Sequence, residues 1–217
     1  MDKNSSYDTT KKWKGSPIFA RLYPKMAASG DNIGFATVRE WAMSKTIGTG
    51  IEIGCGDGRN FDYLPDDVEI LGIEPEEQLA TAAKVRATGK PIRVVQGFAE
   101  RTNLPSSSVD FVVSTLTLCS VSSIEQTLAE VSRLLKPGGK LISVEHCLAP
   151  GRLFPTWQRV ADVVWPHLFG GCHTTRDIVP AIELAGFERV ELEWFNFPSD
   201  RSLSPARWMF KGVFVKP

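Results

Sequence analysis

The amino-acid sequence predicts an α/β fold built on a doubly wound, mostly parallel sheet with an antiparallel pair of strands at one edge. Short apolar runs alternate with segments of helical periodicity, which is the pattern that βαβ units produce. A glycine-rich turn follows the first of these runs, where a parallel sheet carries its ligand site. The last two runs are separated only by a loop rich in Pro and Ser, which indicates an antiparallel connection.

Seven apolar runs are expected to form the strands. The first five are short, rich in Val or Ile and bounded by turn residues, as buried parallel strands are. They cover residues 50–53, 68–73, 92–95, 109–114 and 140–144. Residues 190–197 and 208–215 are expected to pair with each other as the antiparallel edge.

Helices are expected between the strands, on both faces of the sheet, because parallel strands are joined by right-handed crossovers. The clearest covers residues 124–135, where apolar side chains share one face. Ser122 and Glu125 form a capping-box pattern in front of it, and the turn at residues 136–139 ends it. A second helix is predicted from about residue 175 to 185, with Gly186 as its stop.

Length and composition suit one domain, residues 1–217, of ordinary globular type. Basic and acidic residues number 25 each, so the general electrostatic attraction to nucleic acid is missing. The only basic cluster is Lys11, Lys12 and Lys14, which a solvated arm explains at least as well. No apolar stretch is long enough for a signal peptide or a bilayer span, so we expect a cytoplasmic protein without stable membrane insertion. The oligomeric state is not indicated.

The main chemical signal is the segment from Glu52 to Gly58, with glycines at positions 54, 56 and 58. Glycines at the carboxyl end of a parallel strand let the backbone approach a ligand and supply turns with positive φ. A helix N-terminus just beyond the turn is expected to offer free N–H groups. The third glycine comes one residue too early for the dinucleotide-binding pattern G-x-G-x-x-G, and the phosphate-binding P-loop pattern is absent.

This spacing resembles the S-adenosylmethionine (SAM) loop of class I methyltransferases. Further landmarks of that family follow in its order: Glu74 ends the second strand, residues 97–100 follow the third, and residues 114–116 end the fourth. The resemblance spans roughly residues 50–186. It implies a seven-stranded, Rossmann-like methyltransferase sheet and an enzyme that transfers the methyl group of SAM to a small acceptor.

The resemblance also implies residue roles. Glu52 would face the amino group of SAM, the glycines would pack against its amino-acid part, and Glu74 would accept the ribose hydroxyls. Phe98 stands where the family has an acid, so adenine recognition would depend on backbone groups and apolar contact. The N-terminal arm, residues 1–30, would cross SAM and contribute Tyr23 or, alternatively, Tyr7. The full predicted SAM set is Tyr23, Glu52, Gly54, Cys55, Gly56, Gly58, Asn60, Glu74, Pro75, Phe98, Ala99, Glu100, Thr115 and Leu116.

Other segments resemble the thiol S-methyltransferases, a branch that methylates small alkyl thiols and hydrogen sulfide. These are residues 115–121, 144–146, 157–158, 165–166 and 171–176. The animal members carry an N-terminal membrane anchor, whereas this sequence predicts a soluble enzyme. The implied acceptor is the thiol of a metabolite, xenobiotic or natural product. Two alternatives are a C- or O-methyltransferase of quinone or phenol type and a non-catalytic SAM-binding module.

Methyl transfer from a sulfonium requires positioning more than acid–base chemistry. A base would still increase the thiolate fraction of an acceptor thiol. The candidate bases are His146 and His173, with Glu145 as an orienting group; each also has a purely structural interpretation. Cys172 beside His173 supplies only two possible ligands, so no metal is predicted.

Residues 147–173 form a longer connection than a βα loop needs. Positions 157, 160, 161, 164 and 168 share one helical face. This insertion is expected to roof an apolar acceptor pocket, to cover the sheet, or both. The predicted pocket residues are Thr117, Cys119, Trp157, Trp165 and Cys172.

Overall fold

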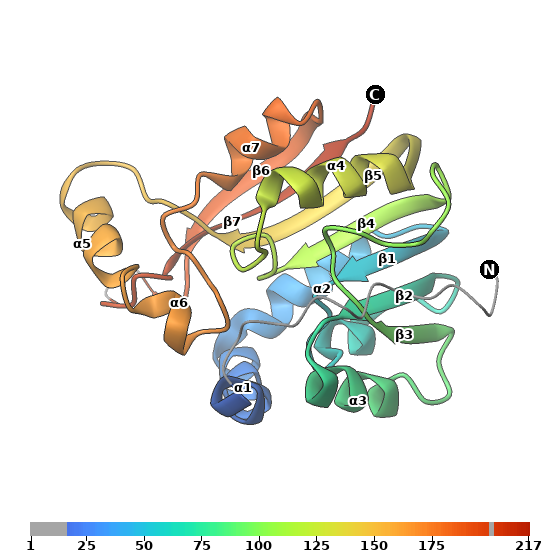
Figure 1. The fold of residues 1–217 in the computed structure, drawn as a ribbon, viewed down its shortest axis with the longest axis horizontal. Helices are drawn as coiled ribbons and strands as arrows, with labels where there is room; N and C mark the ends of the chain where they lie inside the picture. The colour runs from blue at the N-terminus through green and yellow to red at the C-terminus, as the bar shows by residue number, and fades with distance from the viewer. Residues whose placement is uncertain (1–16, 200–201) are drawn as a thin grey trace.

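A computed structural model describes residues 17–199 and 202–217. Its centre is a seven-stranded sheet with the strand order β3-β2-β1-β4-β5-β7-β6 (Figure 1). β7 pairs antiparallel with β5 and with β6, and every other pairing is parallel. The predicted sheet and its antiparallel edge are therefore confirmed. The strands are β1 (Thr49–Ile53), β2 (Glu69–Glu74), β3 (Ile92–Gln96), β4 (Val109–Thr115), β5 (Leu135–His146), β6 (Glu188–Asn196) and β7 (Trp208–Val215).

Helices cover both faces of the sheet, as a doubly wound fold requires. One face packs against α4 and α7, whose apolar side chains join those of β1, β2 and β4 in one buried cluster. The other face packs against α2 and α3 in a second cluster (Figure 1). The helices are α1 (Pro17–Gly30), α2 (Ala36–Ser44), α3 (Glu77–Arg86), α4 (Ile124–Leu134), α5 (Leu153–Ala161), α6 (Trp165–Leu168) and α7 (Ile178–Leu184), with a kinked segment η1 (Asp31–Phe35) and a 3₁₀ helix η2 (Arg59–Tyr63).

The predicted helix starts need two corrections. The cap of α4 is Ser123, whose hydroxyl accepts from the Gln126 N–H, while the Ser122 N–H donates to Glu100. Helix α7 begins at Ile178 and not near residue 175. The reason is that Asp162 accepts hydrogen bonds from the residues just before it, Thr174 and Thr175, and holds them in a loop.

No α-helix opens directly after the glycine turn. The chain there makes only the short 3₁₀ helix η2, and Leu64 behind it has an extended backbone. Because Leu64 precedes a proline, the α conformation is sterically disfavoured at this position. The expected helix N-terminus is thus missing, and the turn itself must supply any N–H groups.

The insertion is two helices, α5 and α6, and not one. The predicted apolar face points mostly outward: Trp157, Val160, Val164 and Leu168 are 45%, 61%, 56% and 59% exposed. The buried residues of α5 are Pro155 and Gln158, and the Gln158 amide binds the backbone of residues 147, 149, 174 and 205. These four hydrogen bonds set the rotation of α5. Among the described residues, no helix is long and apolar enough to cross a membrane.

Candidate active site

A cavity of about 910 Å³ opens beyond the carboxyl ends of the central strands. Ligands of doubly wound sheets bind in this position, where the strand order reverses between β1 and β4. Its walls come from α1, the glycine turn, the end of β2, residues 98–100, residues 115–122, the end of β5, residues 165–173 and the connection between β6 and β7. Segments far apart in the sequence therefore meet around one space.

Glycine backbone forms one wall of this cavity. Gly54 and Gly56 have φ of 61° and 57°, a conformation that side chains rarely tolerate. A Cβ on Gly54 would overlap the Thr117 side chain, and one on Gly56 would lie 2.9 Å from the Tyr23 ring. Only glycine fits at either position.

Glu74 presents a buried carboxylate to the same wall. Its Oε2 accepts from the Gly56 N–H and its Oε1 from the Glu76 N–H, both at 2.9 Å. Burial raises its pKa to about 7 despite these two hydrogen bonds. Each carboxylate oxygen can accept a further hydrogen bond, so the group remains able to bind hydroxyls.

Helix α1 crosses the glycine turn and brings Tyr23 onto it. Arg59 holds this helix in place, since its guanidinium donates to the Pro24 carbonyl in the middle of the helix at 2.6 Å and pairs with Asp31, just beyond its end, at 2.9 Å. Burial raises the pKa of Tyr23 to about 12, so the phenol stays protonated. The alternative Tyr7 lies outside the described residues, as do Lys11, Lys12 and Lys14.

Four residues predicted to bind SAM do not line the cavity. Glu52 is buried and accepts from Asn60 at 2.8 Å; its other oxygen has no hydrogen-bond partner among the described residues. Asn60 in turn joins Thr115 and Arg39, which makes a buried polar network. The other two are Cys55, which is buried, and Gly58, where a Cβ would lie 2.6 Å from the Phe61 ring.

Glu145 is fully buried and does not orient a histidine. Its carboxylate accepts from the Ser114 hydroxyl at 2.6 Å and from the backbone N–H groups of residues 117, 118 and 119. The side chain therefore fastens the loop after β4 to the end of β5. These contacts agree with its structural interpretation, and the catalytic role stays a prediction.

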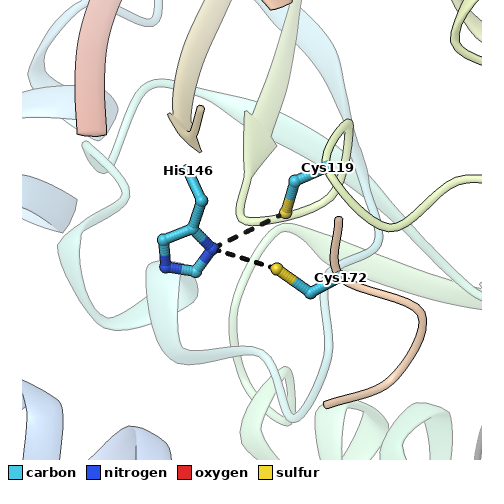
Figure 2. Close-up of side chains that lie close together, drawn as sticks. All are labelled: Cys119, His146 and Cys172. Carbon is cyan, nitrogen blue, oxygen red and sulfur yellow. Dashed lines mark hydrogen bonds between the residues drawn. The ribbon is translucent and has the colours of Figure 1, made fainter. Parts of the chain in front are cut away.

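The two candidate bases occupy different surroundings on the cavity wall. The Nδ1 of His173 lies 2.9 Å from a carboxylate oxygen of Asp162. The Nδ1 of His146 lies 3.7 Å from the sulfur of Cys119 and 3.3 Å from that of Cys172 (Figure 2). The expectation of only two possible ligands near Cys172 is wrong, because His146 and Cys119 make it a group of three.

Of the two tryptophans predicted for the pocket, only one lines the cavity. Trp165 lines the cavity and stacks on Phe169, with ring centroids 3.9 Å apart. Trp157 does not line it: its indole N–H donates to the Leu203 carbonyl on the outer side of α5. The inward rotation of Gln158 accounts for this, because Trp157 is its immediate neighbour on the helix.

Comparison with known proteins identifies the family. The chain is 36% identical over 183 residues to the thiol S-methyltransferase TMT1B of Rattus norvegicus, covering 82% of this chain and 75% of that protein. It is 33% identical over 186 residues to the thiol S-methyltransferase TMT1A of Homo sapiens, covering 83% and 76%. Residues 51–143 match the methyltransferase domain family. The chain belongs to the class I SAM-dependent methyltransferases.

Solved structures agree with this methyltransferase fold. A SAM-dependent methyltransferase from Thermotoga maritima, described as a possible histamine N-methyltransferase, superposes with a TM-score of 0.66. The superposition covers 92% of this chain and 98% of that one at 24% sequence identity, so the likeness concerns the fold alone. The predicted enzyme class, small-molecule acceptor and SAM cofactor are supported by the family.

Two functional candidates of this methyltransferase escaped the sequence analysis. Arg39 on α2 lines the cavity, donates to Asn60 at 3.0 Å and pairs with Asp31 at 2.7 Å. Asp162, just after α5, holds His173. Neither belongs to a motif, and only the folded chain brings them to the site.

Proposed function

We propose that this enzyme transfers the methyl group of SAM to the sulfur atom of a small thiol. The observation that carries the proposal is its likeness to two thiol S-methyltransferases across most of the chain. The cavity supports it, because its lining combines polar backbone with the aromatic side chains of Trp165, Phe169 and Phe197. Sites for small molecules are mostly apolar with a few placed polar groups.

The residues present fit SAM. In the proposal, Gly54 and Gly56 leave room for its amino-acid part and Glu74 accepts its ribose hydroxyls. Tyr23 and Phe98 enclose it from two further sides, and the set is completed by the cavity residues Pro75, Ala99, Glu100, Thr115 and Leu116. When bound, SAM supplies an activated methyl group on a positively charged sulfur. The buried side chains of Glu52 and Asn60 do not line the cavity. Their hydrogen bonds, which include Thr115, hold the ends of β1 and β4 in place.

His173 is the proposed acceptor of the thiol proton. A carboxylate can only accept, so the contact with Asp162 assigns the proton of a neutral imidazole to Nδ1 and leaves Nε2 as the basic nitrogen. Asp162 is in turn held by the Thr174 N–H and the Thr175 hydroxyl. The histidine therefore has a defined tautomer on the cavity wall.

The acceptor class is tested with labelled SAM and a panel of alkyl thiols, aryl thiols, phenols and quinols. Methyl transfer to sulfur alone is the expected result. Transfer to the oxygen or carbon of phenols and quinols, or to no acceptor while SAM still binds, would overturn the thiol assignment.

The role of His173 is tested with the variants His173→Ala and Asp162→Asn. Both are expected to lose turnover most at acidic pH and to recover as pH approaches the ordinary thiol pKa of about 8.5, where the acceptor ionises unaided. An equal loss at every pH would indicate that the pair only shapes the pocket.

A further inference from the structure

Two thiols and one imidazole from three separate segments meet on the cavity wall. Cys119 follows β4, His146 ends β5, and Cys172 lies beyond α6 (Figure 2). Their ligand atoms all lie within 4.8 Å of one another, and all three residues line the cavity. The proposed function uses neither sulfur, so this cluster calls for a separate account.

The two nitrogen-to-sulfur distances are close to the edge lengths of a tetrahedral metal site. With zinc bonds of about 2.3 Å to sulfur and 2.0–2.1 Å to nitrogen, neighbouring ligands stand about 3.6 Å (N to S) and about 3.8 Å (S to S) apart. The His146 nitrogen lies 3.7 Å from one sulfur and 3.3 Å from the other. Only small shifts would admit an ion, and thiolates with an imidazole are the donors that zinc prefers.

Hydrogen bonds hold the three ligand segments in place without the metal. The Cys119 N–H donates to Glu145 at 3.2 Å, which ties the loop to the residue before His146. The N–H of His173, next to Cys172, donates to the Cys119 carbonyl at 2.8 Å. The Arg176 guanidinium donates to two carbonyls of the same loop, both at 2.6 Å. Preorganised ligands of this kind are typical of metal centres.

We propose that Cys119, His146 and Cys172 bind one zinc ion whose fourth coordination position opens to the acceptor cavity. Three protein ligands with an open fourth position is the arrangement of catalytic rather than structural zinc. The identity of the fourth ligand rests on the proposed function: it is the sulfur of the acceptor thiol. Binding to the ion removes the thiol proton, which passes to solvent.

The bonds and charges of the methyl transfer step then balance. The acceptor thiolate forms a bond from its sulfur to the methyl carbon, while the bond from that carbon to the sulfonium sulfur breaks. The electron pair of the broken bond stays on the departing sulfur, so the positive charge of SAM and the negative charge of the thiolate cancel. A neutral thioether is a poorer ligand than a thiolate and leaves the ion.

The first test measures metal content. The full chain, kept reduced, is equilibrated with Zn²⁺, dialysed and analysed for metal. We expect about one zinc per chain, lost in Cys119→Ser, Cys172→Ser and His146→Asn. Cys147→Ala is the control, because Cys147 is also buried and adjoins His146 but does not line the cavity. No zinc in the wild type, zinc retained by all three ligand variants, or a Cys119–Cys172 disulfide forming instead would overturn the proposal.

The second test separates this inference from the thiol assignment. Cobalt-loaded protein is titrated with an alkyl thiol without SAM, and its thiolate-to-cobalt absorption is recorded. We expect the thiol to change the band in the wild type, and a phenol to leave it unchanged. Thiol methylation that survives metal removal and Cys172→Ala would refute the zinc role and leave the acceptor assignment intact. Bound zinc without thiol methylation would refute the acceptor assignment and leave the metal site intact. Circular dichroism and SAM affinity report whether each variant is folded.

Discussion

The buried carboxyl of Glu52 should make the stability of the ligand-free protein depend on pH. Burial raises its pKa from 4.5 to about 8, although Arg39 and the hydrogen bond from Asn60 oppose the shift. A group with a raised folded pKa binds its proton more tightly in the folded state. Its contribution is therefore most favourable below the unfolded value of 4.5 and is lost as pH rises through about 8. Replacing the carboxyl by an amide, Glu52→Gln, removes this titration.

The size of the effect follows from the two pKa values. At about pH 5 the unfolded carboxyl is already mostly ionised while the folded one is still protonated, and at about pH 8 the folded one is half ionised. Proton linkage then gives a loss of about 3 kcal/mol of stability over this interval from Glu52 alone. The amide of Gln can still accept from Asn60, and its N–H₂ imitates the protonated carboxyl. Any cost of leaving that donor unpaired does not vary with pH.

Denaturant unfolding at several pH values between about 5 and 8, without SAM, is the assay. As pH rises over this range, the free energy of unfolding of Glu52→Gln minus that of the wild type should increase by about 3 kcal/mol. Glu69→Gln, an exposed glutamate on β2, serves as the control and should track the wild type. Parallel curves for Glu52→Gln and the wild type would show that the carboxyl stays ionised in the folded protein.

Three further variants test the geometry of the site. Gly56→Val should abolish SAM binding by calorimetry, because its side chain meets the Tyr23 ring 2.9 Å away, whereas Gly89→Val has similar left-handed strain in open space and should bind normally. Arg176→Met should lower kcat by about tenfold while SAM affinity holds, since it frees the loop after β4 from two hydrogen bonds. Trp165→Ala should raise the acceptor KM by about tenfold, and Trp157→Ala should leave it unchanged, since only Trp165 lines the cavity. An effect on KM from Trp157 instead would contradict this wall of the site.

The sheet and the glycine turn could be predicted because their signals are local. Buried parallel strands need apolar side chains on both faces, and β1, β2 and β4 show this as short runs rich in Val, Ile and Leu. The turn needs φ near +60° at Gly54 and Gly56, which restricts the residue type directly. Such constraints act within a few residues, so one sequence displays them.

The errors arose where a tertiary contact overrode the local pattern. The apolar periodicity of residues 157–168 predicted an inward face, but Gln158 satisfies four backbone groups and turns that face out. Likewise, Asp162 binds residues 174 and 175 and delays the start of α7. In both cases one polar side chain with several partners outweighs a stripe of apolar ones, because unpaired buried backbone groups are costly.

The Cys119, His146 and Cys172 cluster shows where prediction from topology ends. β4 and β5 are parallel neighbours, and Thr115 pairs with Val144, so the residues that follow the two strands must meet at one edge. Cys119 and His146 were therefore within reach of an argument from strand order alone. Cys172 was not, because its place depends on how residues 172–176 bind the loop after β4. The cavity wall around this cluster is thus assembled by contacts between loops, whereas the glycine turn is built into the end of a strand. Loop substitutions can then reshape this wall without disturbing the glycine turn.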